Sequence, residues 1–290
     1  MLELSYRNGK YYMHEDDINL PLSEFEKYNN IYSGSVFLLA SGASVNDFPV
    51  SRYSKFPFVA MNGSILRLVD ENVSPLFYVC DDSRFPHEHP ELAVSGCKNS
   101  WNIAMTFKSY NEIWLNDPTV LFGKPLYFLD RINRHCIGKN VSDRRFAWSV
   151  RNDLEIISSF SLFGKKINRI GFSKNMARGF YNSRTVVYTA LQLVYTLGFQ
   201  KVFIVGMDMN KAVGRFYDNK SGNFPQKILP TTIDVDYDNY ILPSFKIFSE
   251  KFLKKQDSFK VFNLSKSSRI PDKVIPKISI NQLDSLLFEV

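Results

Sequence analysis

One stretch of the chain decides its fold. It begins as Gly179-Phe-Tyr-Asn-Ser-Arg-Thr185, continues through residues 186–199, and ends as Lys201-Val-Phe-Ile-Val-Gly-Met-Asp208. Apolar side chains recur at helical spacing within residues 186–199, whereas residues 202–205 form a short continuous apolar run bounded by glycines. The first pattern predicts an amphipathic helix, and the second predicts a strand that is buried on both faces, as in a parallel sheet.

A helix that leads directly into a buried strand is typical of a Rossmann-like sheet. Ligands of such sheets bind beyond the carboxyl ends of the strands, which places Asp208 and Asn210 at a ligand site. The start of the helix adds unpaired backbone amides and the hydroxyl groups of Ser183 and Thr185, which suit an anion. The stretch therefore predicts one wall of a nucleotide-binding crevice.

Three earlier apolar runs also end in small or polar residues. Residues 35–40 are followed by Ser41-Gly-Ala-Ser44, residues 56–61 by Asn62-Gly-Ser64, and residues 75–80 by Asp81-Asp82. When parallel strands end in this way, their ends line one shared crevice. The sequence thus predicts an α/β fold with a mainly parallel sheet flanked by helices.

The rest of the chain extends this single domain. We expect residues 1–30 to be an extension packed on a domain of residues 31–290, with lid or insertion segments at 84–165 and 211–238. Further strands are predicted at 101–107, 125–129 and 260–264, and a further helix at 245–255.

Composition limits the function classes. The chain has 290 residues, of which 44% are hydrophobic, and a formal charge of +7 that favours acidic partners such as nucleotides, anionic sugars, nucleic acid or an anionic membrane surface. Its three cysteines have no paired spacing, which argues against a disulfide framework and a zinc ribbon and favours a reducing cytoplasm. Because no apolar stretch is long enough to span a membrane, we expect a soluble or peripheral protein.

The loop Ser41-Gly-Ala-Ser44 has a composition suited to a phosphate. It lacks the lysine of a P-loop and the third glycine of a dinucleotide fingerprint, so ATP hydrolysis and NAD binding lose support. Gly42 lets backbone amides approach a phosphate, and the two serine hydroxyls can contact a ribose or a phosphate. Taken alone, the loop is equally consistent with a plain strand-to-helix turn.

Asp82 and His87 are candidate bases toward an acceptor hydroxyl. A carboxylate at a strand end can serve as a base or a metal ligand, but Asp82 can equally cap a helix and pair with Arg84. Asp81 ranks below Asp82. Neutral imidazole suits proton abstraction, although Pro86-His-Glu-His-Pro90 is more typical of an exposed loop.

Three further residues have both a functional and a plain structural explanation. Asn62 offers an amide that can read a base edge, yet Asn-Gly is also a common turn. Arg215 and Tyr217 lie in a turn-rich segment where they can clamp a leaving phosphate or simply pack the loop.

A set of short motifs runs in order from about residue 36 to residue 283. They are Ala60-Met-Asn-Gly-Ser64, Asp82-Ser-Arg-Phe85 with His87, Gly171-Phe-Ser-Lys174, residues 185–197, Gly206-Met-Asp208, Arg215-Phe-Tyr-Asp218, and Phe262-Asn-Leu-Ser265 with Arg269-Ile270. In this order they resemble the WaaZ-type enzymes of lipopolysaccharide core biosynthesis. Those enzymes add a further 3-deoxy-D-manno-oct-2-ulosonic acid (Kdo) residue to the inner core from CMP-Kdo.

The resemblance implies a glycosyltransferase with a GT-A-variant, sialyltransferase-like fold. It implies transfer of Kdo from CMP-β-Kdo to the Kdo region of the inner core, with inversion to an α linkage. The chain is more distantly similar to bacterial CMP-sialic-acid sialyltransferases, whose CMP-binding positions correspond to Ser41, Ser44, Asn62 and Asp208. Those enzymes use a histidine base in the lid region, but no histidine follows His135 here.

On this basis we assign the chemical roles. Asp82 is expected to act as the base, with His87 as its alternate, while Arg215 and Tyr217 stabilise the departing phosphate. We expect Arg84 or Arg184 to pair with the Kdo carboxylate. The full set of residues expected to bind the donor is Ser41, Gly42, Ser44, Asn62, Arg84, Ser183, Arg184, Thr185, Asp208 and Asn210.

The scheme requires no cofactor or metal, although Asp82 and Asp208 leave a divalent metal open. The expected partners are the CMP-sugar donor, a lipid-linked Kdo-containing acceptor and the anionic cytoplasmic face of the inner membrane, with no nucleic acid. Two alternatives stay open: another CMP-sugar transferase such as a sialyltransferase, and a non-catalytic module that binds a lipopolysaccharide precursor.

Overall fold

An eight-stranded sheet forms the centre of the molecule. The computed structural model describes residues 1–138, 140–210, 214–217 and 233–288. The strand order is β13-β12-β5-β6-β7-β8-β9-β4, and every neighbouring pair runs parallel. The predicted α/β class with a parallel sheet is confirmed. The strands are β4 (Leu22–Ser23), β5 (Ser35–Leu39), β6 (Phe58–Met61), β7 (Phe77–Cys80), β8 (Asn102–Met105), β9 (Leu126–Phe128), β12 (Lys201–Val205) and β13 (Lys260–Asn263).

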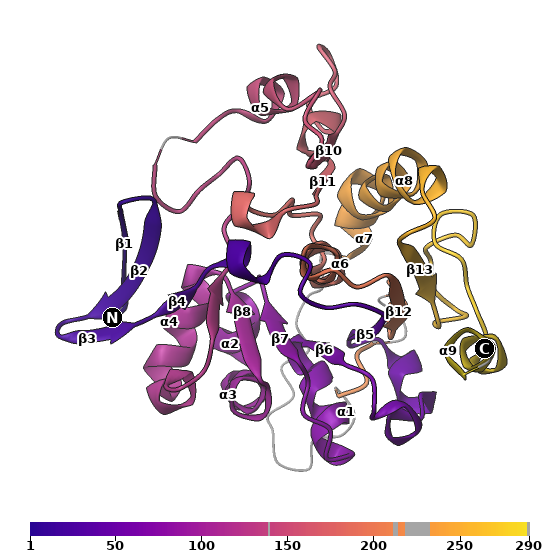
Figure 1. Ribbon diagram of the computed structural model, residues 1–290, viewed down its shortest axis with the longest axis horizontal. Coiled ribbons are helices and arrows are strands. Elements are labelled where there is room, and N and C mark those ends of the chain that lie inside the picture. Colours follow the sequence, from indigo (N-terminus) through magenta and orange to yellow (C-terminus); the bar gives the residue numbers. More distant parts are fainter. Residues whose placement is uncertain (139, 211–213, 218–232, 289–290) are drawn as a thin grey trace.

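Helices cover both faces of this sheet (Figure 1). On one face α6 (Val186–Leu197) and α8 (Leu242–Lys251) pack into one hydrophobic cluster. On the other face a second cluster includes α1 (Ile65–Asp70), α3 (Pro90–Asn99), α4 (Phe107–Asn116) and α9 (Ile280–Phe288). The sheet is therefore the middle layer of three.

The two-sided burial explains the continuous apolar runs of the sequence. In β5, Val36 and Leu38 belong to the cluster with α6, while Phe37 and Leu39 belong to the cluster on the opposite face. All four side chains are fully buried. Since successive strand residues point to opposite faces, both sets must be apolar when helices cover both sides.

The N-terminal residues form a small sheet of their own. Strands β1 (Glu3–Arg7), β2 (Lys10–Glu15) and β3 (Ile18–Leu20) pair antiparallel beside the main sheet (Figure 1). The next strand, β4, already pairs with β9 in the main sheet. The change between the two sheets thus falls at residue 21, and a domain division at residue 30 stays a prediction.

Residues 84–165 differ from the insertion that the sequence suggested. Their first half supplies α2 (Arg84–Glu88), α3, β8, α4 and β9, which are part of the central layers. Their second half holds α5 (Asp143–Ser149) and β10 (Ile156–Ser158), and β10 pairs antiparallel with β11 (Gly171–Ser173) outside the main sheet. Strands of three or four residues leave too little periodicity to be separated from loops.

The second expected lid, residues 211–238, lies mostly outside the described residues. Within it the structure describes residues 214–217, α7 (Ile233–Asp236) and the start of a π-helical turn, η9 (Tyr237–Ile241). Among the described helices, none combines the length and the apolar composition that a membrane span requires.

Gln192 fixes the amino-terminal half of α6 to the chain that precedes it. Its side chain is fully buried. The carbonyl oxygen accepts hydrogen bonds from the Ser173 and Tyr181 amides, and the side-chain amide donates to the carbonyl oxygens of Tyr181 and Tyr188. All donor and acceptor positions of one buried amide are thus used to join β11, the segment at Tyr181 and α6.

Replacing this side chain by an apolar one of similar size tests its role. Gln192→Leu leaves buried backbone groups without partners, so we expect the free energy of unfolding to fall by about 2–4 kcal/mol. Chemical denaturation followed by circular dichroism measures it. The control is Gln282→Leu, which removes the side-chain acceptor of one amide hydrogen bond near the surface and is expected to cost about 1 kcal/mol or less. Equal losses for both variants would contradict the proposed role of Gln192.

Candidate functional site

A cavity of about 640 Å³ opens at the carboxyl ends of β5, β6, β7 and β12. This is where ligands of parallel sheets bind, and the volume is typical of sites for small organic ligands. Of the predicted site residues, the cavity is lined by Ser41, Gly42, Asn62, Asp82, Arg84, Arg184, Thr185, Asp208, Asn210, Arg215 and Tyr217. Ser44, His87 and Ser183 lie outside its lining.

Asp208 joins the ends of the central strands. Its carboxylate accepts hydrogen bonds from the amide of Ser44, at 2.9 Å, and from the Ser44 hydroxyl. That hydroxyl also lies 2.9 Å from the hydroxyl of Ser265, which follows β13. Asp208 is 2% exposed, and its hydrogen bonds to Ser44 hold the loop after β5 against the end of β12.

The close approach of this loop requires glycine. A Cβ atom on Gly42 would lie 2.4 Å from the Gly206 carbonyl oxygen and 2.6 Å from an Asp208 carboxylate oxygen. Gly206 has a positive φ of 76°, a conformation that favours glycine, and it has no side chain that would occupy this contact. Glycine at position 42 therefore serves the packing of two strand ends, and it also leaves the loop backbone lining the cavity.

Asn62 presents an unsatisfied acceptor at the cavity. It follows β6 with a left-handed φ of 50°, which asparagine tolerates better than most residues. Its Oδ1 atom is buried and has no hydrogen-bond partner within the described parts of the chain. A buried acceptor of this kind favours a ligand that brings its own donor, such as an amino group.

The first turn of α6 opens into the same cavity. Val186 and Val187 line it, and the N-cap residue Thr185 makes no side-chain hydrogen bond to the helix amides. Arg184 has a positive φ of 68°, and its guanidinium group lies 5.6 Å from the ring centre of Tyr240. The uncapped amides and a neighbouring cation together suit an anionic group.

Asp82 is engaged by Arg84. The Arg84 guanidinium donates to both carboxylate oxygens at 2.6–3.2 Å, and the Arg84 amide donates to one of them at 3.2 Å. Burial acts to raise the pKa of Asp82, but the hydrogen bonds and charge of Arg84 outweigh it, so the pKa is lowered. The pairing with Arg84 weighed for Asp82 is thus present in the structure, although the N-cap residue of α2 is Ser83, and the pairing makes this carboxylate a weak base.

Asp81 has the opposite environment. Burial raises its pKa to about 6, against the hydrogen bond from the Thr189 hydroxyl, which lowers it. The Thr189 oxygen lies 2.5 Å from Asp81 Oδ2, and Asp81 lines the cavity. A carboxyl group with a pKa near 6 is poised to exchange a proton near neutral pH.

His87 lies on the exposed side of α2. Its side chain is 73% exposed, and its Nδ1 atom lies 3.1 Å from a carboxylate oxygen of Glu112. This position is outside the lining of the cavity, so the histidine is not brought together with the other predicted residues.

Arg215 and Tyr217 reach the cavity through backbone pairing. Arg215 forms an isolated antiparallel bridge with Gly42, and the amide of Phe216 donates to the Ser41 carbonyl oxygen at 3.1 Å. Tyr217 packs where a side chain on Gly63 would clash with its ring. The segment 214–217 is therefore seated on the ends of β5 and β6.

Comparison with known proteins decides the family. The family model described as 3-deoxy-D-manno-octulosonic acid transferase WaaZ matches residues 22–281. The chain belongs to the WaaZ family. A relative from Salmonella typhimurium, named a probable 3-deoxy-manno-octulosonic acid transferase, is 25% identical over 252 residues, covering 87% of this chain and 89% of the relative. A relative of the same name from Escherichia coli is 24% identical over 256 residues, covering 88% and 86%.

The WaaZ-family chain is also similar to a solved structure, the MAf glycosyltransferase from Magnetospirillum magneticum AMB-1. The TM-score is 0.46 at 13% sequence identity, and the match covers 84% of this chain and 33% of that chain.

The sequence analysis missed further residues of this WaaZ-family site, among them Arg131 and Thr189. Arg131 follows β9 and lines the cavity, and its charge acts to lower the pKa of Asp81 and Asp82. Thr189 lies among the buried apolar residues of α6. The one signal in the sequence is that a hydroxyl group at an apolar position needs a buried hydrogen-bond partner. No group of three His, Cys, Asp or Glu side chains suited to a metal occurs in the described ranges, and metal dependence stays a prediction.

The two neighbouring carboxyl groups give opposite pH dependences of stability. Because the pKa of Asp81 is about 6 in the folded protein, against an ordinary value of 3.8, the folded state binds more protons between these values and loses stability as pH rises. Asp81→Asn removes this loss, so its free energy of unfolding relative to the parent is expected to increase by about 3 kcal/mol from pH 4 to pH 7.

Asp82→Asn is the matched control, measured by denaturation at the same pH values. Its lowered pKa contributes stability that is present at neutral pH and is lost as the pH falls, so the variant should lose stability relative to the parent as pH rises. A pH-independent difference for Asp81→Asn would show that Asp81 is not held at a raised pKa.

Proposed function

We propose that this protein transfers Kdo from CMP-β-Kdo to the Kdo region of the lipopolysaccharide inner core, with inversion to an α linkage. Membership in the WaaZ family supports the transferred sugar. The observation that carries the proposal is the cavity itself, which places a carboxyl group of raised pKa beside several arginines and an open helix N-terminus.

The donor carries two anionic groups, a phosphate and the carboxylate of Kdo. Arg131, Arg184 and Arg215 line the cavity from three different segments, and the first turn of α6 adds backbone amides. We assign the phosphate to the side of Arg215, Tyr217 and the loop after β5, and the Kdo carboxylate to Arg184 and the α6 N-terminus. The buried Oδ1 atom of Asn62 then suits the amino group of cytosine.

Inversion requires one displacement at the anomeric carbon. A base takes the proton of the acceptor hydroxyl while its oxygen bonds to the anomeric carbon. The bond from that carbon to the phosphate oxygen breaks, and CMP leaves with the electron pair. Arginine groups stabilise the charge that develops on the phosphate, and the proton ends on the base.

Asp81 suits the role of base better than Asp82. A carboxylate with a lowered pKa, held by Arg84, accepts a proton poorly, whereas Asp81 combines a pKa near 6 with a hydroxyl that fixes its orientation. Asp82 then acts by holding Arg84 at the cavity. A lipid-linked acceptor reaches this site from the anionic inner-membrane surface in the same proposal.

Replacing each carboxylate by its amide separates these roles. We expect Asp81→Asn to lower kcat at least 100-fold, because positioned bases typically contribute 10²–10⁴-fold, while CMP binding is retained. The measurement is CMP release with CMP-Kdo and a Kdo-containing lipid acceptor, with CMP binding by calorimetry. Asp82→Asn is the control and is expected to lose less kcat. The reverse order of losses would return the base to Asp82.

Donor competition tests the substrate. The purified protein is offered CMP-Kdo and CMP-sialic acid with the lipid acceptor, and both products are followed by mass spectrometry. We expect transfer of Kdo with at least tenfold preference, since the acceptor and cavity are proposed to fit that sugar. Consumption of CMP-sialic acid while CMP-Kdo stays intact would overturn the donor assignment. CMP release from neither donor would favour a binding module.

A further inference from the structure

Large apolar side chains are exposed together on the unit formed by α5, β10 and the loop that follows β10. Phe163 is 95% exposed and Leu154 is 86% exposed. Leu162 and Trp148 are each more than half exposed. The unit projects at the top of the molecule in Figure 1, away from the large sheet. We call it the projecting surface, defined by Trp148, Leu154, Leu162, Phe163, Arg144, Arg145, Arg151, Lys165 and Lys166.

The projecting surface carries a net positive charge. Residues 141–169 contain six lysines and arginines and three acidic residues. The three acidic side chains are engaged in ion pairs: Asp143 binds Arg134 and Arg169, and both Asp153 and Glu155 bind Arg178. Among the described residues, the remaining cations Arg144, Arg145, Arg151, Lys165 and Lys166 form no ion pair.

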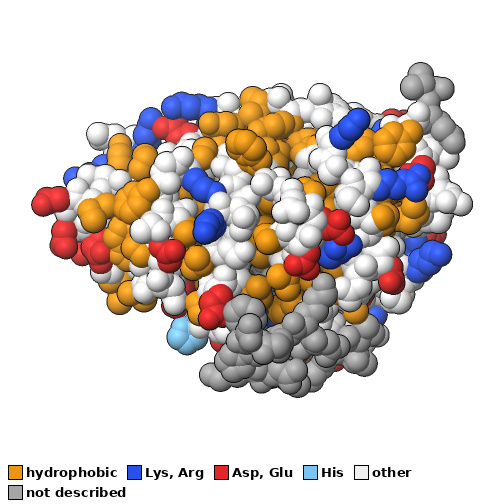
Figure 2. All heavy atoms as spheres, turned by 90° about the horizontal axis from the view of Figure 1, so that it is seen from below, with side chains coloured by type: hydrophobic (Ala, Val, Ile, Leu, Met, Phe, Trp, Pro, Cys, Tyr) orange, Lys and Arg blue, Asp and Glu red, His pale blue; other side chains and the backbone are white. Residues whose placement is uncertain are grey.

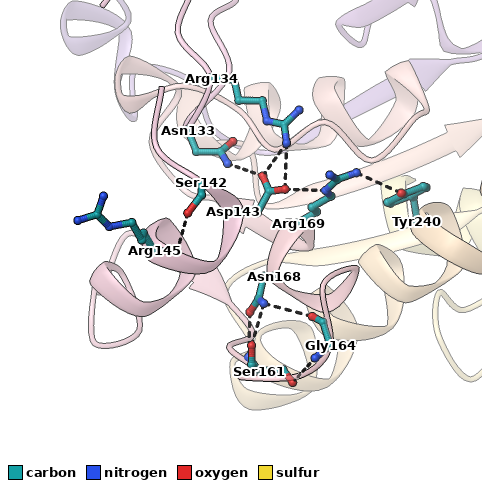
Figure 3. A network of polar contacts seen from close by, with 10 residues as sticks. All are labelled: Asn133, Arg134, Ser142, Asp143, Arg145, Ser161, Gly164, Asn168, Arg169 and Tyr240. Carbon is teal, nitrogen blue, oxygen red and sulfur yellow. Dashed lines mark hydrogen bonds and ion pairs between the residues drawn. The ribbon is translucent and has the colours of Figure 1, made fainter. Parts of the chain in front are cut away.

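Hydrogen bonds of Asn168 with Ser161 and Gly164 hold the loop that carries Phe163 (Figure 3). Asn168 is 2% exposed, accepts a hydrogen bond from the Ser161 amide, and donates to the carbonyl oxygens of Ser161 and Gly164. The Ser161 hydroxyl accepts from the Gly164 amide at 2.9 Å. Leu162 and Phe163 thus stand at the tip of a hydrogen-bonded loop that displays them to solvent.

Trp148 is tied to the same surface. Its ring centre lies 4.9 Å from that of Phe160, and the Arg151 guanidinium stacks 3.7 Å above the indole while donating to the Trp148 carbonyl oxygen. An indole with one wet face and an adjacent arginine is the arrangement that anchors proteins at a lipid headgroup layer.

A polar network connects the projecting surface with the candidate active cavity. Asp143 joins Asn133 and Arg134 to Arg169, whose guanidinium reaches the Tyr240 hydroxyl at 3.4 Å (Figure 3). The guanidinium group of Arg184, which lines the cavity, lies 5.6 Å from the centre of the Tyr240 ring. Contacts between neighbouring side chains thus run from α5, which carries Asp143 and Trp148, to Arg184 in the lining of the cavity.

The face of the molecule seen in Figure 2 looks different. Lysine and arginine side chains are interspersed there with aspartate and glutamate, and neither sign gathers into one field. That face thus lacks the separation of charge that the ion pairs of Asp143, Asp153 and Glu155 produce on the projecting surface.

We propose that the projecting surface docks the protein on an anionic phospholipid bilayer. Leu162, Phe163 and Trp148 enter the headgroup region, while the surrounding lysines and arginines contact lipid phosphates. The unit projects from the molecule, and the charge of its lysines and arginines is complementary to that of anionic lipid phosphates. This proposal specifies the membrane contact within the proposed function, and its test requires neither donor nor acceptor.

Vesicle sedimentation with the full chain tests the proposal. We expect binding to vesicles of phosphatidylglycerol and phosphatidylcholine, and at least tenfold weaker binding to phosphatidylcholine alone. The double variant Leu162→Ser and Phe163→Ser should weaken binding to the anionic vesicles at least tenfold. The double variant Arg144→Gln and Arg145→Gln should weaken it roughly fivefold per charge, and added salt should reduce the difference.

Two matched variants serve as controls. Leu115→Ser removes an apolar side chain that is 60% exposed on α4, and Lys254→Gln with Lys255→Gln removes two exposed lysines near α8. Both should bind vesicles as the parent does. Quenching by brominated lipid should decrease on Trp148→Phe, and circular dichroism verifies that each variant is folded.

Equal vesicle binding by the parent and the Leu162→Ser, Phe163→Ser variant would overturn the proposal. So would self-association of the parent that this variant abolishes without any vesicle binding, because the surface would then be a protein interface. Loss of vesicle binding in a variant that still releases CMP from CMP-Kdo, with the acceptor dispersed in detergent, separates the docking role from transfer itself.

Discussion

The carboxylate of Asp208 is the constraint on which the cavity depends. It accepts two hydrogen bonds from Ser44, whose hydroxyl continues to Ser265, so the ends of β5, β12 and β13 are joined at one point. Such close contact is permitted because position 42 carries no Cβ. The contact holds the ends of these parallel strands together on one side of the cavity. The segment 214–217 packs against them through backbone pairing with Ser41 and Gly42. Asp208 thus shapes the site before it contacts any ligand.

Two adjacent carboxyl groups at the end of β7 are differentiated by what surrounds them. Arg84 holds the pKa of Asp82 low even though burial opposes it, while burial raises that of Asp81 to about 6 and Thr189 fixes its position. One group is suited to staying charged and organising a cation, and the other is suited to exchanging a proton. Helix α6 contributes to both parts of the site, because it carries Thr189 and opens its first turn to the cavity.

The unit of α5, β10 and β11 gives the molecule a second region of organised chemistry. Its acidic side chains form ion pairs with arginines, and Asn168 holds its loop by hydrogen bonds. Apolar and cationic side chains of the unit are therefore left exposed to solvent. Tyr240 lies between this unit and Arg184 of the cavity wall. In the proposed function a lipid-linked acceptor and a nucleotide sugar meet at the cavity, and Tyr240 connects that cavity to the unit proposed to contact the membrane.

The sequence by itself determined the parallel sheet, α6, and eleven of the residues that line the cavity. Continuous apolar runs and polar strand ends are properties of neighbouring residues, so Ser41, Asn62 and Asp208 were visible without coordinates. Only the tertiary structure decided which carboxylate has a raised pKa, that His87 lies outside the cavity, and that Arg131 lines it. The reason is that burial and pairing join distant residues: Thr189 stands 108 positions from Asp81, and no local pattern reports such a contact.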